Sequence, residues 1–298
     1  MGKTLIHEHI LVDFIGADKI SYDRWNKEDV IKRVLPYLEE AKKAGVKTFF
    51  DCTPAFLGRD PLLLKTLSEK SGLHIITNTG YYGAVNNKYL PAWVKDETAG
   101  SLAQRWIKEY KEGIENTGVR PGFIKISVNE GKLSELHQKL VKAAALTHLQ
   151  TGLTICSHTG KAPAAFEQID ILKSNGVKPD AFVWVHAQAE SDKSLHTKAA
   201  QMGAWVSLDG IAWGDHENYA DSIIRLKQQQ LLHRVLISHD AGWYRPGEPN
   251  GGQFTGFTAI FTKLLPLLEQ KGCTAADTKQ LLVINPEIAF TTGIRSVN

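Results

Sequence analysis

TLIHEHILV, residues 4–12, is an apolar run broken only by His7-Glu8-His9. A short run rich in Ile, Leu and Val is typical of a strand in a parallel sheet that is buried on both faces. From this run outward, one rhythm repeats along the chain: an apolar run, a turn, then an amphipathic helix such as those predicted over 29–44 and 134–150. The apolar runs are residues 4–12, 46–51, 74–79, 122–127, 153–158, 181–186, 204–209 and 234–240.

Eight such units predict the α/β class and a (β/α)8 TIM barrel, with residues 1–298 forming a single domain. An open doubly wound sheet is the alternative, but it rarely needs eight units, and no glycine-rich phosphate loop follows the first run. Residues 277–290 are predicted to form a short closing helix on the outside. Because the first run begins almost at residue 1, we expect either that the chain is shortened or that another segment or a second subunit, as in a homodimer, covers the N-terminal end of the barrel.

Composition narrows the class of protein. The 298 residues are 43% hydrophobic and 22% charged, which excludes a disordered chain. The net charge is +3 and the basic residues are scattered, so we expect no nucleic-acid partner. No apolar run approaches the roughly 18 residues of a membrane span. Three cysteines imply no disulfide framework. A cytoplasmic protein is expected, with export by a removed N-terminal segment as the alternative.

Polar side chains cluster at the ends of the predicted strands, where TIM-barrel chemistry takes place. Side chains alternate along a strand, so His7 and His9 share one face while Glu8 points the other way. Each such residue has an ordinary structural interpretation alone, but six at one end of a barrel would be costly to bury unless a divalent metal binds them. The residues predicted to line this end are His7, His9, Lys125, His158, His186 and Asp240.

Lys125 is the unusual member of this set. Two dications would repel an ammonium group, so the lysine must be neutral, displaced or chemically altered. Carbamylation by CO₂ would convert it into a long carboxylate able to bridge two metals. A Schiff-base lysine, as in aldolase-like barrels, is the alternative, and it leaves the histidines without a role.

This ordered set of residues resembles the binuclear metal signature of the phosphotriesterase family within the amidohydrolase superfamily. The resemblance extends over the whole chain. Further matching motifs are Asp51-Cys52-Thr53, Gly58-Arg59-Asp60, Thr79-Gly80-Tyr81-Tyr82 and Asn285-Pro286.

The resemblance implies two divalent metal ions, with zinc expected first and cobalt, manganese or iron as alternatives. It implies that carbamylated Lys125 and a hydroxide bridge the two ions, and that the hydroxide attacks an ester-like substrate. The implied ligands are His7, His9 and Asp240 for the more buried metal and His158 with His186 for the more exposed one.

Proton transfer falls, by the same resemblance, to Asp240, which would accept or relay the hydroxide proton. Asp209, at the end of the seventh run, is a candidate relay. Its alternative role is to cap the turn at Gly210. At the position that Gly210 occupies in this chain, lactonase-like members of the family commonly carry arginine.

We therefore expect a metal-dependent hydrolase whose small-molecule substrate is a lactone or carboxyl ester. An organophosphate triesterase is the main alternative, and a non-catalytic metal-containing binding protein is another.

Loop residues could form an apolar pocket with an arginine that recognises an anionic group, or they could simply pack on one another. These residues are Tyr81, Tyr82, Trp213, Trp243 and Arg245. The histidines expected to be solvated on helix faces are His137, His148, His196 and His233.

Overall fold

The strands of the computed structural model, which describes residues 1–297, follow one another in barrel order. They are all parallel and form two sheets, ordered β10-β1-β2-β3 and β4-β5-β6-β7-β8-β9. The strands are β1 (Lys3–Leu11), β2 (Val46–Asp51), β3 (His74–Ile76), β4 (Asn78–Thr79), β5 (Phe123–Ser127), β6 (Ile155–His158), β7 (Phe182–Val185), β8 (Trp205–Leu208), β9 (Val235–Ile237) and β10 (Gly242–Tyr244).

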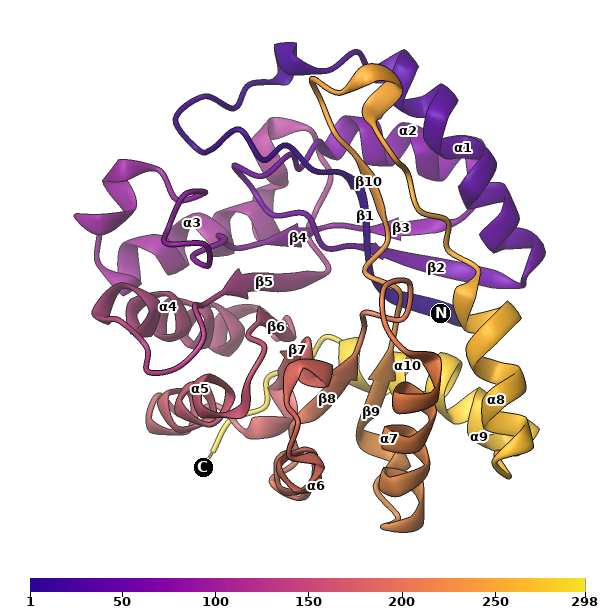
Figure 1. Cartoon of the computed structure of the whole chain (residues 1–298). Helices are drawn as coiled ribbons and strands as arrows, with labels where there is room; N and C mark the ends of the chain where they lie inside the picture. The colour runs from indigo at the N-terminus through magenta and orange to yellow at the C-terminus, as the bar shows by residue number, and fades with distance from the viewer. Residues whose placement is uncertain (298) are drawn as a thin grey trace.

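This arrangement confirms the predicted TIM-barrel fold, with the strands around one centre and the helices outside (Figure 1). The hydrogen-bonded ladder is interrupted between β3 and β4, so the predicted run 74–79 is two short strands. It is interrupted again after β9, yet the Asp240 N–H still donates to the His7 carbonyl (3.0 Å) and the His9 N–H to that of Ala241 (2.8 Å). The chain then continues as β10, which pairs with β1.

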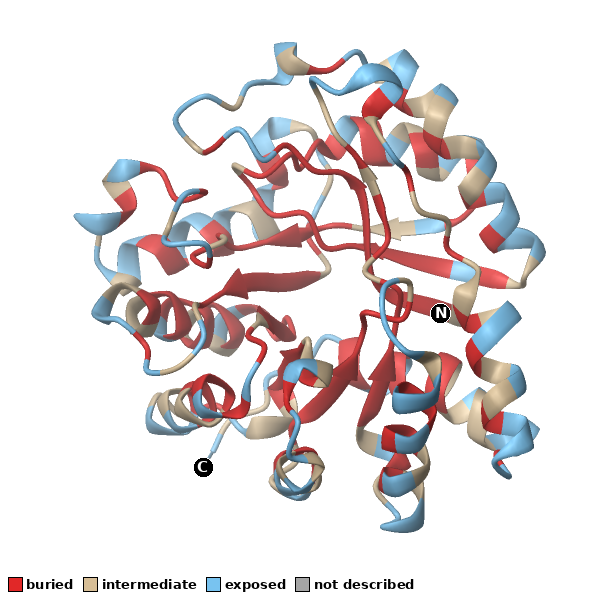
Figure 2. Ribbon diagram, in the orientation of Figure 1, coloured by how far each residue is buried: buried red, intermediate tan, exposed pale blue. Residues whose placement is uncertain are grey.

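Helices cover the strands, with exposed outer faces and buried inner faces (Figure 2). The predicted helix over 29–44 is α1, whose N-cap Asn26 accepts hydrogen bonds from the backbone of Glu28 and Asp29. No helix within residues 1–297 is both long and apolar enough to span a bilayer. The helices are α1 (Lys27–Lys43), α2 (Pro61–Ser71), α3 (Ala99–Glu112), α4 (Glu135–Thr151), α5 (Ala162–Ser174), α6 (Lys193–Gln201), α7 (His216–Gln228), α8 (Leu265–Gln270), α9 (Ala275–Lys279) and α10 (Asn285–Phe290).

The C-terminal segment covers the N-terminal end of the barrel. Helices α9 and α10 are joined through a π-helical stretch, so residues 275–290 are helical throughout, close to the predicted range. The segment is not confined to the outside, however. The Phe290 ring lies 4.3 Å from that of Phe50 and 6.0 Å from that of Phe123, measured between centroids. The covering element is therefore the chain itself, and no second subunit is needed for it.

Three histidines expected to be solvated are buried, and that prediction was wrong. His137, His148 and His196 are at most 2% exposed. The inner faces of their helices pack against loops whose carbonyl groups bond these imidazoles, as between His196 Nε2 and the Ala187 carbonyl (2.7 Å). A polar side chain on a helix face is buried at little cost when a backbone group satisfies it. His233 is exposed, as expected.

Candidate metal centre

The six residues predicted as metal ligands line one small pocket at the carboxyl ends of the strands. The free space among them is about 60 Å³. They come from β1, β5, β6 and the positions that follow β7 and β9, which are far apart in sequence. They are His7, His9, Lys125, His158, His186 and Asp240.

The donor atoms converge closely. Asp240 Oδ1 lies 3.2 Å from His9 Nε2 and 3.6 Å from His7 Nε2. The same Nε2 of His7 is 3.3 Å from Lys125 Nζ. The rings of His158 and His186 line the same pocket, with their centroids 4.4 Å apart. Imidazole nitrogens and a carboxylate at this spacing are a suitable donor set for a divalent cation.

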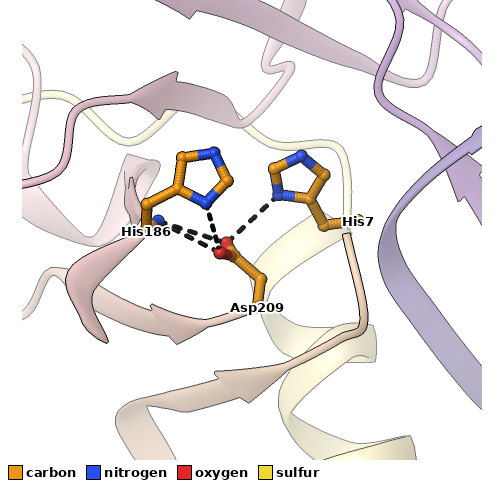
Figure 3. Close-up of side chains that lie close together, drawn as sticks. All are labelled: His7, His186 and Asp209. Carbon is orange, nitrogen blue, oxygen red and sulfur yellow. Dashed lines mark hydrogen bonds and ion pairs between the residues drawn. The ribbon is translucent and has the colours of Figure 1, made fainter. Parts of the chain in front are cut away.

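Asp209 lies beneath this donor set and is fully buried. Its carboxylate accepts hydrogen bonds from His7 Nδ1 at 3.1 Å and from His186 Nδ1 at 2.7 Å (Figure 3). Ser207 Oγ (2.6 Å) and the Gln188 side chain (3.3 Å) donate to it as well. Within residues 1–297 its side chain bonds nothing at the Gly210 turn, so the structure favours contact with the ligand histidines over the capping alternative.

His9 and Glu8 bond different partners because successive side chains of β1 lie on opposite faces of the strand. His9 Nδ1 is 2.8 Å from Thr53 Oγ1, which leaves Nε2 free to face the pocket. Glu8 points to the opposite side, where it accepts hydrogen bonds from Ser238 Oγ and His239 Nδ1, each at 2.7 Å. This buried cluster ties β1 to the end of β9 and thereby fixes the relative positions of His7, His9 and Asp240.

Unusual backbone geometry aims two of the donors. His186 has φ of 61° and Asp240 has φ of 53°, in the left-handed region that non-glycine residues seldom occupy. Gly80 and Gly242 allow their own backbone to pass close to the strands that carry Lys125 and His9. A Cβ at Gly80 would lie 2.1 Å from the Lys125 carbonyl, and one at Gly242 would lie 1.8 Å from that of His9. Left-handed backbone at non-glycine residues such as His186 and Asp240 is a form of strain that is concentrated at functional sites.

Electrostatics favours neutral imidazoles at His7 and His158 beside an ionised Asp240. Burial, together with nearby Lys125, lowers the pKa of His7 to about 3, and burial with neighbouring His186 holds that of His158 well below its usual range. Burial would raise the pKa of Asp240, but a hydrogen bond with His9 helps to bring it to about 2. Neutral imidazole and carboxylate are the forms that bind metal.

His186 and Asp209 form a tightly coupled pair. Burial acts to lower the pKa of His186, but the Asp209 carboxylate outweighs it and raises that pKa. Burial acts to raise the pKa of Asp209, and the contacts with His186 and His7 instead hold it well below its usual range. Asp209 is therefore an anion that accepts hydrogen bonds, and Nε2 is the atom of His186 left to bind a metal.

The residues predicted to bind substrate divide into two groups. Tyr82 and Trp243 line the pocket, with the Tyr82 hydroxyl 3.2 Å from both ring nitrogens of His158. Trp213, Tyr81 and Arg245 lie outside the pocket. Trp213 is 53% exposed, and its indole donates to the Asp240 carbonyl at 2.6 Å. Tyr81 packs against Phe56 in another cavity, and Arg245 lies over the Trp243 ring, with Nη1 3.7 Å from Glu248.

Three apolar residues of the pocket were missed by the sequence analysis. Val12 and Phe14 follow β1 directly, and Leu57 lies in the loop after β2. The only signal for Val12 and Phe14 was their position at the carboxyl end of a strand. Leu57 carried no local signal, because the path of a loop is set by its tertiary contacts.

Comparison with known proteins identifies relatives along nearly the whole chain. A family model described as the phosphotriesterase family matches residues 1–290. The phosphotriesterase homology protein of Escherichia coli (strain K12) is 29% identical, over 97% of this chain and 98% of that protein. The aryldialkylphosphatase of Saccharolobus solfataricus is 26% identical, over 98% and 95% of the two chains. The phospho-furanose lactonase of Mycoplasmopsis synoviae is 25% identical, over 96% and 87%.

A solved structure agrees with the fold. The crystal structure of the Escherichia coli phosphotriesterase homology protein, complexed with phosphate in its active site, matches with a TM-score of 0.83. Sequence identity over this match is 28%, and it covers 97% of this chain and 99% of that one.

Proposed function

Because the chain belongs to the phosphotriesterase family, we propose that it is a hydrolase with a binuclear metal centre that cleaves a lactone or carboxyl ester. The observation that carries this proposal is the convergence of four imidazoles, Lys125 and Asp240 in one pocket. Such groups are costly to bury together unless they bind something. A divalent metal pair satisfies them all, whereas a Schiff-base lysine would leave the imidazoles unused.

The two proposed metal positions divide the donor set. His7, His9 and Asp240 would hold one ion, and His158 with His186 the other. Bound there, the two divalent ions, zinc foremost, supply hydroxide near neutral pH and polarise the substrate carbonyl. Lys125 lies between the two groups, 1% exposed, with no carboxylate within 4 Å among residues 1–297. A carbamate formed there with CO₂ would replace a buried ammonium by an anion.

Two aspartates take different roles in the proposed reaction. Asp240 is 17% exposed at its side chain and faces the pocket, so it would accept the proton that the hydroxide loses as it attacks the carbonyl. Asp209 is fully enclosed beneath His7 and His186. A proton from Asp240 would reach it only through an imidazole. We therefore assign Asp209 chiefly to orienting the two rings.

The lining of the pocket supports a neutral substrate with an apolar part. Val12, Phe14, Leu57 and Trp243 surround the donors, and Lys125 is the one cationic side chain among the residues described there. Arg245 lies outside, near Glu248. This lining does not favour a phosphorylated substrate. The relative named aryldialkylphosphatase makes an organophosphate triester the second candidate.

A substrate panel tests the proposal. Chelated and zinc-reconstituted proteins are assayed side by side on γ- and δ-lactones, an aryl carboxyl ester and an aryl phosphotriester. Zinc-dependent turnover of lactones or the carboxyl ester well above the triester is expected. Faster triester turnover would reverse the order of the two candidates. Full zinc loading without turnover of any substrate would favour a metal-containing binding protein instead.

A further inference from the structure

A second cavity, of about 490 Å³, lies beside the metal pocket. The two cavities lie on opposite sides of the same two loops. Leu57 and Tyr82 face the metal pocket, whereas Phe56 and Tyr81 line the second cavity. Its volume is in the range of small-molecule sites in proteins. The proposed hydrolysis uses none of its residues.

Aromatic side chains from two parts of the chain form its walls. Tyr22 and Trp25 come from the segment before α1, with ring centroids 5.5 Å apart. Phe56 and Tyr81 come from the two shared loops, with centroids also 5.5 Å apart. Tyr81 is 6% exposed and packs edge-on against Trp106, with ring centroids 5.3 Å apart.

The charge in this cavity is negative. Its one guanidinium, Arg59, is buried and already bonded to Glu109, with Nη2 2.7 Å from Oε1. Two more carboxylates line the cavity, Glu115 and Asp23. Glu115 accepts a hydrogen bond from the Tyr22 hydroxyl at 2.6 Å, and its other oxygen is 3.9 Å from Arg59. Nearby Lys27 is paired with Asp60 at 3.1 Å, and its ammonium lies over the outer ring, that of Tyr22, at 5.8 Å from the centroid.

We propose that this cavity binds an organic ammonium ion, held between the aromatic pairs and the carboxylates of Glu115 and Asp23. Aromatic faces attract a desolvated cation, and quaternary ammonium groups are recognised in this way. The lining carries three carboxylates against one guanidinium, and both terminal nitrogens of Arg59 already bond Glu109, so an anion would meet net negative charge.

Calorimetric titration with choline and its neutral carbon isostere, 3,3-dimethylbutan-1-ol, tests the site. The two probes have nearly the same shape and differ in charge. We expect choline to bind about tenfold more tightly than the alcohol, and equally to chelated and zinc-loaded protein. The variant carrying both Asp23→Asn and Glu115→Gln should weaken choline binding about tenfold. Glu112→Gln is the control. Glu112 pairs with Lys108 and does not line the cavity, so this variant should leave the affinity for choline unchanged.

Four results would overturn the proposal: equal affinity for choline and the alcohol, binding of inorganic phosphate in preference to choline, choline binding that disappears with the metal, or binding unaffected by the double variant. None of these results bears on the hydrolytic activity, which is assayed separately. All variants retain similar side-chain shapes at exposed positions, and circular dichroism verifies that they fold.

Discussion

His186 donates from Nδ1 to Oδ1 of Asp209 over 2.7 Å. The second oxygen of the same carboxylate accepts from His7, whose position in the chain is far from that of His186. One buried anion therefore orients an imidazole from each of the two proposed metal positions. A carboxylate that accepts from Nδ1 fixes the ring and makes Nε2 a better ligand. The two positions are thus coupled through a residue that faces neither the pocket nor the substrate.

Asp209→Asn should weaken both metal positions together. The amide can accept from one imidazole only, and its NH₂ group would oppose the Nδ1–H of the other. We expect metal affinity to fall about 10- to 100-fold for both ions. Metal content after dialysis against graded chelator concentrations measures this loss. Thr53→Val is the matched comparison, because His9 is the one proposed ligand that the Thr53 hydroxyl bonds among residues 1–297, and it should weaken one ion only. Loss of a single ion in Asp209→Asn would contradict the shared role.

Lys125→Ala should abolish activity and reduce metal content to well under two ions per chain. The lysine is buried between the donor groups, and its removal deletes the proposed bridging carbamate. Formate or propionate in the buffer should restore part of the activity and part of the metal content, because the acid can occupy the space that the lysine side chain leaves. Lys161→Ala, at a lysine whose side chain is 58% exposed, serves as the control. Activity retained without added acid would exclude a carbamate bridge.

Asp240→Asn should retain much of the bound metal but turn over substrate about 10²- to 10⁴-fold more slowly. The amide keeps an oxygen toward His7 and His9 but cannot accept a proton. Steady-state kinetics with metal content measured on the same sample separates the two effects. Asp215→Asn is a suitable control, because Asp215 caps α7 and asparagine caps equally well. Near-normal turnover of Asp240→Asn would assign proton transfer elsewhere.

His196 should make the fold less stable in acid. Burial lowers its pKa from 6.5 to about 4, so it stays neutral in the folded state. Above pH 6.5 it is neutral in both states and its contribution is fully present. As the pH falls from 6.5 to 4, the unfolded chain takes up a proton that the folded chain does not, and stability falls by on the order of 3 kcal/mol.

Thermal melting of metal-free protein between pH 7.5 and 4.5 measures this dependence. His196→Gln, which can still donate to the Ala187 carbonyl, should flatten the curve. His233→Gln, at the exposed histidine, should leave the slope as in the parent chain. Equal slopes for all three proteins would exclude His196 as the cause.

Local pattern was sufficient for much of this protein. The alternation of apolar runs and helical periods predicts the barrel, because side-chain period reports which faces are buried. The same alternation places His7 and His9 on one side of β1 and Glu8 on the other, and the structure agrees. Parallel strands bring their carboxyl ends to one edge, so the convergence of the six donors was also predictable.

Contacts between distant segments could not be predicted in this way. The sharing of Asp209 by two histidines depends on the distance between β1, β7 and β8, which no single element specifies. The left-handed backbone at His186 and Asp240 is imposed by surrounding packing, against local preference. Phe290 reaches the barrel interior, and Tyr81 and Tyr82 enter different cavities, because the paths of terminal and loop segments follow tertiary contacts. Sequence period determines which face of an element is buried, and packing alone decides what that face meets.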